Sequence, residues 1–313
     1  MRNAFVETLV EVGAADERVL LLTGDLGYTA LEPFAERFPE RFFNVGVAEQ
    51  NMLGMATGLG EAGFTPFVYS IATFASMRPY EFFRNGAVLH QLPVRVVGMG
   101  GGLDYGPNGL SHYALEDVAL MRAQPDLTVL VPADADQASE AVRAIGSIPG
   151  PVYLRLEKDG SPVPGLGGRF ELGRAETIGS GDDVAIVAMG GIAREAVGAA
   201  ELLAGQGLDA TVVIVSTLNP APTNELADIL GQVPLAVTLE AHYVTGGLGS
   251  LTCEVVAERG LDCRVIRCGL TEVPRGVTGS RDALYRHYGL AAANVAQAVL
   301  DQIALPAPPS LGA

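Results

Sequence analysis

A single carboxylate, Glu49, stands where a predicted strand passes into a predicted helix. Residues 42–47 read FFNVGV and predict a buried strand, whose apolar side chains are Phe42, Phe43, Val45 and Val47. Further along, apolar residues recur at helical spacing, at Met52, Leu53, Met55, Ala56 and Leu59. A charge at this junction is poorly solvated, and burial favours the protonated form of a carboxyl group. The pattern therefore predicts a glutamate at a position where a charge is costly.

Two explanations of Glu49 remain open from its position. An isolated glutamate near a helix start most often caps that helix or pairs with an arginine. The whole string is more specific than the single residue. It resembles the glutamate segment in the pyrimidine-binding domain of transketolases, which are thiamine diphosphate enzymes, through Asn44, Gly46, Glu49, Gln50, Gly54 and Gly58.

This resemblance implies a defined task for Glu49. Thiamine diphosphate becomes reactive at its thiazolium ring when its own aminopyrimidine ring acts as the base, and a glutamate at the far ring nitrogen favours the required tautomer. Glu49 is therefore expected to bind the cofactor and to act in catalysis. The same resemblance places Asp25, in the segment Gly24-Asp25-Leu26-Gly27, among the cofactor-binding residues.

Residues 66–91 predict a strand that runs into an aromatic-rich helix. Phe74, Met77 and Tyr80 recur at intervals of three, and on spacing alone such a helix face belongs to a hydrophobic core. In transketolases the segment after the glutamate helix carries an aromatic cluster that stacks on the pyrimidine ring of the cofactor. The resemblance implies that Phe74 and Tyr80 stack on this ring, with Met77 at a position where the family often has a second phenylalanine.

A glycine-rich loop follows the next predicted strand. Gly98-x-Gly100 is followed by Leu103, so the loop lacks the spacing of a dinucleotide fingerprint. The turn Asn108-Gly109-Leu110-Ser111-His112 resembles the active-site turn D-G-P-T-H of the family. It implies that Asn108 and His112 bind substrate, and that His112 also relays protons in catalysis. Without this setting, a lone loop histidine is usually a satisfied turn residue.

Two departures from the family concern the substrate. Asn108 replaces the aspartate that reads a donor hydroxyl, and Gly100 replaces a histidine that helps to hold a sugar phosphate. The sequence thus leaves open whether the substrates are phosphorylated. Arg2, Thr29 and Arg155 match family positions that approach the substrate, although the two arginines are equally compatible with surface salt bridges.

Uninterrupted apolar runs predict two α/β domains. Six strands separated by helices indicate a parallel sheet covered on both faces, at 19–24, 42–47, 66–71, 94–99, 127–132 and 151–156. The alternation restarts with strands at 184–189, 210–215, 235–240 and 263–268. We predict a pyrimidine-binding domain at 1–165, a linker at 166–182, a smaller transketolase C-terminal domain at 183–305 and a tail at 306–313.

The segment 239–250 resembles the turn that opens a helix in the transketolase C-terminal domain. Its glycines permit a tight passage from strand to helix, so a structural role is favoured. The N-terminus of that helix is also a place where an anion could bind.

Composition excludes several classes of function. With 20 basic and 36 acidic residues the net charge is −16, which opposes binding to nucleic acids and to anionic lipid surfaces. Cys253, Cys263 and Cys268 lack the spacing of a zinc site or a disulfide framework. No apolar run reaches the length of a membrane span, and no export signal is evident. These features favour a cytoplasmic location.

The resemblance covers only two of the three transketolase domains. Thiamine enzymes hold magnesium diphosphate through a Gly-Asp-Gly segment and a later asparagine, which neither Gly24-Asp25-Leu26 nor Gly181-Asp182-Asp183 provides. The chain therefore resembles the C-terminal subunit of a two-component transketolase. An N-terminal partner would supply the diphosphate and Mg²⁺ site, and the pair would form an α2β2 heterotetramer that shares thiamine diphosphate.

The expected activity is transfer of a two-carbon ketol unit from a ketose-type donor to an aldehyde-type acceptor. One alternative is the beta subunit of the decarboxylating component of a 2-oxo acid dehydrogenase, which has the same two domains but lacks the Ala48-Glu49-Gln50 pattern. Another is a noncatalytic binding subunit that kept the fold, which Gly100 and Asn108 suggest and the retained Glu49 and His112 oppose.

Overall fold

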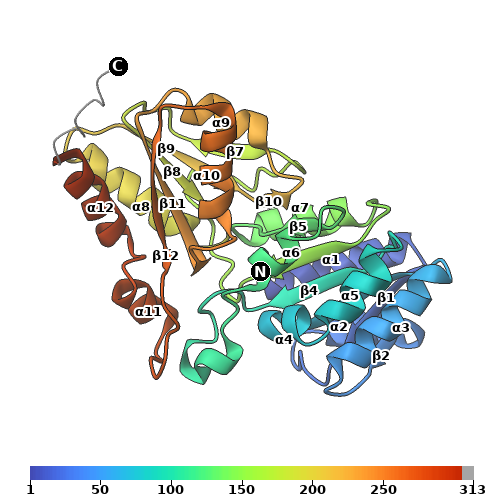
Figure 1. Ribbon diagram of the computed structural model, residues 1–313. Coiled ribbons are helices and arrows are strands. Elements are labelled where there is room, and N and C mark those ends of the chain that lie inside the picture. The colour runs from blue at the N-terminus through green and yellow to red at the C-terminus, as the bar shows by residue number, and fades with distance from the viewer. Residues whose placement is uncertain (305–313) are drawn as a thin grey trace.

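Runs of Val, Ile and Leu form the inner strands of two sheets, each in its own α/β domain (Figure 1). The computed structural model describes residues 1–304. The first sheet has seven strands in the order β10-β5-β6-β4-β3-β1-β2, and the second has five in the order β12-β11-β8-β9-β7. Two α/β domains built on mostly parallel sheets confirm the predicted fold class.

The strands of the first domain are β1 (Val19–Thr23), β2 (Phe42–Asn44), β3 (Thr65–Ile71), β4 (Arg95–Met99), β5 (Thr128–Leu130) and β6 (Val152–Leu156). Its helices are α1 (Arg2–Ala15), α2 (Glu32–Arg37), α3 (Glu49–Glu61), α4 (Ala72–Met77), α5 (Tyr80–Phe83), α6 (Asp117–Arg122) and α7 (Ala135–Ile145). Four short helical segments complete it: η1 (Pro39–Arg41), η2 (Arg84–Val88), η3 (Gly106–Asn108) and η4 (Leu110–His112).

The strands of the second half are β7 (Ala175–Ile178), β8 (Val184–Ala188), β9 (Ala210–Val215), β10 (Thr217–Asn219), β11 (Leu235–Tyr243) and β12 (Arg264–Leu270). Its helices are α8 (Ala193–Ala204), α9 (Thr223–Leu230), α10 (Leu248–Arg259), α11 (Arg281–His287) and α12 (Ala292–Ala304).

Two short strands depart from the predicted organisation. β10 follows β9 in the chain but pairs antiparallel with β5, so the second half completes the first sheet. β7 lies inside the segment expected as a linker, 166–182, and pairs antiparallel with β9 at the edge of the second sheet. Both strands are too short to give an apolar periodicity, and only the three-dimensional arrangement provides their partners.

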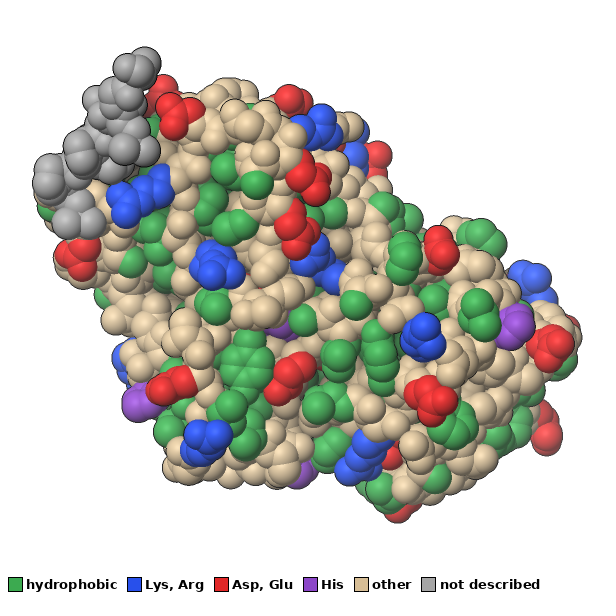
Figure 2. Space-filling model, in the orientation of Figure 1, with side chains coloured by type: hydrophobic (Ala, Val, Ile, Leu, Met, Phe, Trp, Pro, Cys, Tyr) green, Lys and Arg blue, Asp and Glu red, His purple; other side chains and the backbone are tan. Residues whose placement is uncertain are grey.

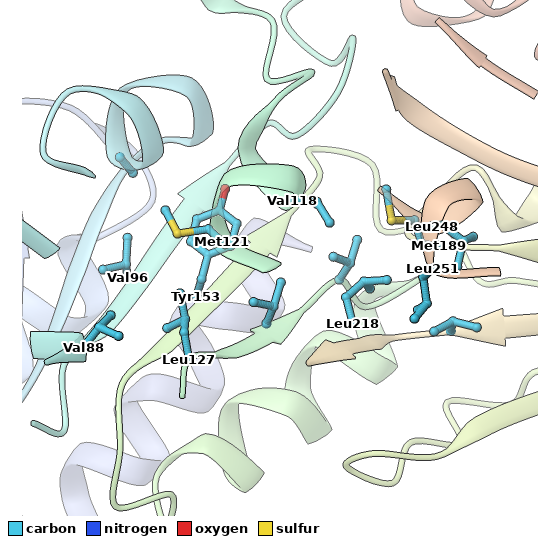
Figure 3. Close-up of a cluster of buried hydrophobic side chains, with 14 of the residues drawn as sticks. Val88, Val96, Val118, Met121, Leu127, Tyr153, Met189, Leu218, Leu248 and Leu251 are labelled. Atoms are coloured by element: carbon cyan, nitrogen blue, oxygen red, sulfur yellow. The ribbon is translucent and has the colours of Figure 1, made fainter. Parts of the chain in front are cut away.

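The hydrophobic core runs continuously across the boundary between the domains. Figure 3 shows Val96, Met121 and Tyr153 of the first domain in one cluster with Met189 and Leu248 of the second. On the other face of the first sheet, α1 and α7 cover a separate cluster that includes Phe5 and Phe34. The continuous cluster fixes the orientation of the two domains.

The prediction of a buried strand over residues 42–47 is wrong. β2 is the outer strand of its sheet, and the chain leaves the sheet after Asn44. Phe43 is therefore 37% exposed and Val47 is 70% exposed. On α3, Met52, Leu53 and Ala56 are buried as predicted, whereas Met55 faces outward.

Within the described residues, none of the helices combines the length and the apolar character needed to cross a bilayer. The tail predicted at 306–313 lies outside the described residues.

Candidate active site

Glu49 is the first residue of α3, and its side chain is buried although the neighbouring surface is open. It is 3% exposed, whereas Val47 and Gln50 on either side of it are exposed. Ser70, near the end of β3, donates a hydrogen bond to Oε1 at 3.1 Å. Arg78, which follows α4, donates to Oε2 at 2.8 Å. The pairing with an arginine, one of the two explanations left open by the sequence, is therefore present. Each carboxylate oxygen of Glu49 accepts one hydrogen bond.

The carboxyl ends of β1 and β2 form the floor of the site beside Glu49. A Cβ atom at Gly24 would lie 3.4 Å from the Gly46 carbonyl oxygen and 3.8 Å from Glu49 Oε1, so Gly24 lies directly beside the carboxylate. Asp25, in the left-handed region at φ 57°, accepts hydrogen bonds from the side chains of Tyr28 and Asn44 at 2.7 and 2.9 Å. These bonds, that of Tyr28 above all, lower the pKa of the Asp25 carboxyl.

A line of stacked groups leads away from Glu49. The Arg78 guanidinium carbon lies 3.8 Å from the centre of the Phe74 ring, which also contacts His112, whose ring centre lies 5.2 Å away in an edge-on arrangement. His112 in turn lies 5.7 Å from the Tyr105 ring. Its Nδ1 is 3.0 Å from the Ser111 hydroxyl. The structure thus brings the predicted residues Glu49, Phe74 and His112 into one contiguous face.

The other two residues of the predicted aromatic cluster lie differently. Tyr80 packs on the hydrophobic core, and its hydroxyl donates to the Leu120 carbonyl at 2.9 Å. Among the described residues, no aromatic contact joins Tyr80 to Phe74. Met77 is half exposed, and its sulfur accepts a hydrogen bond from Thr73 at 3.4 Å.

The loop from Gly100 to His112 lies between the two domains. Asn108 is exposed at the end of η3, and Tyr113 connects the loop to the second domain through a hydrogen bond to the Val277 carbonyl at 3.0 Å. The Tyr105 ring fills the space that a side chain at position 100 would need. A histidine at position 100 is therefore incompatible with this arrangement of Tyr105.

The three remaining predicted substrate residues do not gather around His112. Arg155 is 2% exposed; its Nη2 donates to the Ala241 carbonyl at 2.8 Å and its Nε lies 3.5 Å from Asp117. Because it is enclosed at the domain boundary, we do not propose it as a substrate ligand. Arg2 lines a separate cavity of about 360 Å³ with Lys158. The backbone N–H of Thr29 donates to Glu32 at 2.8 Å.

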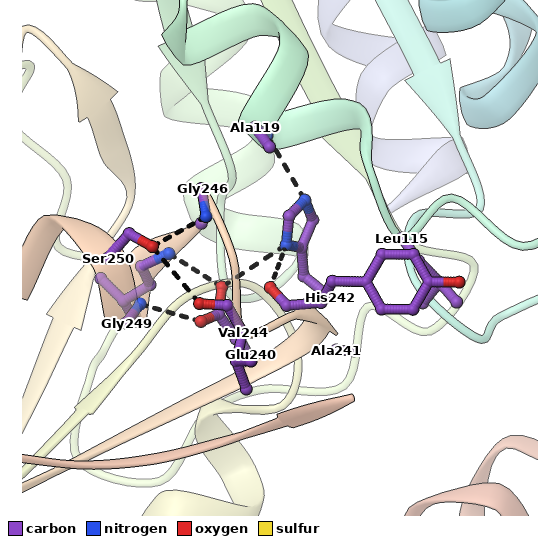
Figure 4. A network of polar contacts seen from close by, with 12 residues as sticks. Leu115, Ala119, Glu240, Ala241, His242, Val244, Gly246, Gly249 and Ser250 are labelled. Atoms are coloured by element: carbon purple, nitrogen blue, oxygen red, sulfur yellow. Dashed lines mark hydrogen bonds and ion pairs between the residues drawn. The ribbon is translucent and has the colours of Figure 1, made fainter. Parts of the chain in front are cut away.

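The turn at 239–250 is a structural connection (Figure 4). Glu240 accepts hydrogen bonds from the backbone N–H groups of Leu248 and Gly249, both at 2.8 Å, so the N-terminus of α10 already holds a carboxylate of its own chain. His242 accepts from the Ala119 N–H at 3.3 Å, across the domain boundary. Burial lowers the pKa of His242 to about 4, which keeps the ring neutral.

The site opens to the surface beside Glu49. A cavity of about 590 Å³ is lined by Val47, Ala48, Glu49, Gln50, Asn51 and Arg78. Apolar side chains that remain exposed in this part of the chain include Val47, Met77 and Phe82. The face of the molecule in Figure 2 mixes such apolar side chains with acidic and basic ones. Among residues 1–304, no three His, Cys, Asp or Glu side chains gather as a metal site requires.

The residues present fit a flat heteroaromatic ring that carries an N–H donor or a ring nitrogen. Glu49 supplies a buried carboxylate, and the Phe74 ring supplies a flat apolar surface that Arg78 contacts. His112 contacts Phe74 edge-on and is partly exposed, so an imidazole is available there for proton exchange.

Two family models match the chain. Residues 1–162 match the transketolase pyrimidine-binding domain, and residues 173–295 match the transketolase C-terminal domain. A protein named as a transketolase C-terminal section, from Methanocaldococcus jannaschii, is 36% identical over 307 residues, which cover 97% of this chain and 96% of that protein.

Two further relatives are also matched over nearly their whole length. The 6-deoxy-6-sulfo-D-fructose transketolase subunit SqwH of Clostridium sp. (strain MSTE9) is 35% identical over 95% of this chain and 92% of its own length. A solved structure, described as a split gene transketolase in an inactive beta4 tetramer, superposes with a TM-score of 0.85 at 39% identity and 96% coverage of both chains.

Proposed function

The chain belongs to the transketolase family, and from that premise we propose that it is the C-terminal subunit of a thiamine diphosphate-dependent enzyme that transfers a two-carbon ketol unit. The observation that carries the proposal is a carboxylate held out of water, Glu49, which Arg78 connects to the face of an aromatic ring, Phe74. This carboxylate also borders a cavity of about 590 Å³, which gives a flat polar ring a route to it.

Each residue of the site has its own proposed role. Thiamine diphosphate, when bound, supplies a reactive carbon that carries the ketol unit. Glu49 would hold a proton at the pyrimidine end, oriented by Ser70, and Phe74 would support the ring. His112 would exchange protons with the carbonyl or hydroxyl groups of the substrate, and exposed Asn108 would bind a ketose-type donor or an aldehyde-type acceptor.

A partner subunit follows from what the chain lacks. We propose that an N-terminal subunit binds the diphosphate and Mg²⁺, and that the two subunits form an α2β2 heterotetramer with the cofactor between them. Relatives of the same length are named as a transketolase section and a transketolase subunit, which supports this division. The inactive beta4 tetramer of the split-gene relative likewise favours dependence on a partner.

The names of the relatives favour ketol transfer over the two alternatives. A 2-oxo acid dehydrogenase subunit shares the two domains, but the two relatives described above, which match over nearly their whole length, are named as a transketolase section and a transketolase subunit. The retained Glu49, Phe74 and His112 favour a catalytic subunit over a noncatalytic one.

Replacing one carboxylate oxygen tests the role of Glu49. In the complex with the partner, Glu49→Gln should lower kcat by about 10²- to 10⁴-fold, because an amide occupies the same space but cannot hold the proton. Glu61→Gln, at the exposed end of the same helix, is the matched control and should leave kcat unchanged. A Glu49→Gln complex that turns over like the wild type would contradict the assignment.

A further inference from the structure

Arg78 occupies the position that the proposed function gives to the cofactor ring. Its Nη1 donates to Glu49 Oε2 at 2.8 Å, and its guanidinium carbon lies 3.8 Å from the centre of the Phe74 ring. Both groups assigned to the pyrimidine ring are therefore already in contact with one side chain of the same chain. Arg78 and Glu49 also line the same cavity of about 590 Å³.

The guanidinium group resembles the cofactor ring in its flat shape and in its N–H donors. It is flat and delocalised, so it stacks on an aromatic face, and its N–H groups lie in its plane, where they can bind a carboxylate. At 3.8 Å from the ring centre it is in van der Waals contact with Phe74. A second flat group cannot lie on this part of the Phe74 face and reach Glu49 until Arg78 has moved.

Arg78 is placed so that it can move. Its side chain is 43% exposed, compared with 2% for that of Glu49. Within the described residues, its side-chain hydrogen bonds go to Glu49 alone. Ser70 would continue to hold Oε1 of the carboxylate after Arg78 leaves. Water can hydrate the guanidinium after it leaves, whereas the buried carboxylate needs a new partner, which the arriving ring would provide.

We infer that Arg78 fills the pyrimidine site of the isolated subunit and moves away from Glu49 when the cofactor ring binds. This inference rests on the proposed function, which it extends by one residue of the cofactor site. Binding of the ring then exchanges one flat N–H donor for another at Glu49, so the buried carboxylate keeps a partner in both states. Arg78 competes with the cofactor for Glu49 and Phe74.

Calorimetric titration of the two-subunit complex with thiamine diphosphate tests the inference. Arg78→Met removes the competing guanidinium but keeps an unbranched side chain, and it should tighten the Kd of thiamine diphosphate by about five- to tenfold. Arg84→Met is the matched control: Arg84 is exposed, and its side chain pairs with Asn85. The Kd of the Arg84→Met complex should equal that of the wild type.

The possible outcomes separate the two claims. If thiamine diphosphate binds to the wild-type complex and binds more tightly to the Arg78→Met complex, both the proposed function and the inference are supported. Binding with an unchanged or weaker Kd for Arg78→Met overturns the inference and leaves the proposed function standing. If neither the wild type nor either variant binds thiamine diphosphate, the proposed function fails, and the inference fails with it. A structure of the loaded complex with Arg78 still on Glu49 would also overturn the inference.

Discussion

Glu49 is buried because the chain changes from strand to helix at that residue. β2 ends at Asn44, the chain leaves the sheet, and α3 begins with the glutamate turned back toward β3, where Ser70 meets it. The acid thus has a protein partner on each oxygen, one neutral and one charged. A carboxylate removed from water in this way needs such partners. In our inference, the cofactor ring replaces Arg78, the charged partner, when it binds.

Phe74 is expected to contribute to cofactor affinity through its ring face. Phe74→Ala should weaken the Kd of thiamine diphosphate for the complex by about two- to twelvefold, because stacking on an aromatic ring contributes about 0.5–1.5 kcal/mol. Phe64→Ala is a suitable control, since Phe64 is an exposed phenylalanine that follows α3. Equal affinities of all three complexes in calorimetric titration would rule out the stacking role.

The sequence located Glu49, Phe74 and His112 through short strings, and the structure brings them together. The sequence analysis did not identify Arg78, although a signal was present. Arg78 is four residues after Phe74, a spacing that puts two side chains on the same side of a helix. Tyr105 was missed because its role depends on contact with Gly100 and His112, which sequence spacing does not reveal. Arg155 matched by type but lies enclosed at the domain boundary.

At the scale of elements, Glu157 connects the end of β6 to the start of α8. It is 3% exposed, and its Oε1 accepts a hydrogen bond from the Gly191 N–H at 2.9 Å. Burial, followed by the nearby charge of Asp104, raises the pKa of Glu157 to about 7. The carboxyl is therefore held in a place that favours its protonated form.

This raised pKa predicts a pH dependence of stability. Between the ordinary pKa of 4.5 and the folded value of about 7, the folded chain binds more protons at Glu157 than the unfolded chain does. The stabilising contribution is complete below pH 4.5 and is lost as the pH rises through 7. Glu157→Gln should remove this dependence, so the thermal midpoint of the variant should rise relative to the wild type between pH 5 and pH 8.

The variant must be compared with the wild type at each pH, because His242 acts in the opposite direction. Its lowered pKa of about 4 makes stability rise with pH up to about 6.5. Glu7→Gln, at an exposed position of α1, controls for the change in net charge. Melting curves in which the wild type and Glu157→Gln shift in parallel with pH would contradict the role given to Glu157.

Most elements were predictable because parallel inner strands are apolar along their whole length. VLLLT, RVVGM and VYLRL form β1, β4 and β6, and all of their residues are buried. β2, β7 and β10 were misjudged or missed because they lie at sheet edges, where burial depends on what covers them. A strand of three residues carries too little periodicity to reveal its partner.

At the scale of the whole molecule, the two domains share one continuous core, and the candidate site lies in the first domain. The continuous core, Arg155 on the Ala241 carbonyl and His242 on the Ala119 N–H join the domains at one boundary. Glu49, Arg78 and Phe74 lie together at the surface, where Val47 and Met77 leave apolar groups exposed. Such groups are expected at a surface that another subunit covers.

Turnover measured with and without the partner subunit tests the central claim most directly. The purified chain, supplied with thiamine diphosphate, Mg²⁺, a ketose donor and an aldehyde acceptor, should show no ketol transfer at any protein concentration. Addition of the N-terminal subunit should produce transfer that saturates when the two subunits are equimolar. Ketol transfer by the purified chain alone would contradict a site shared between two polypeptides.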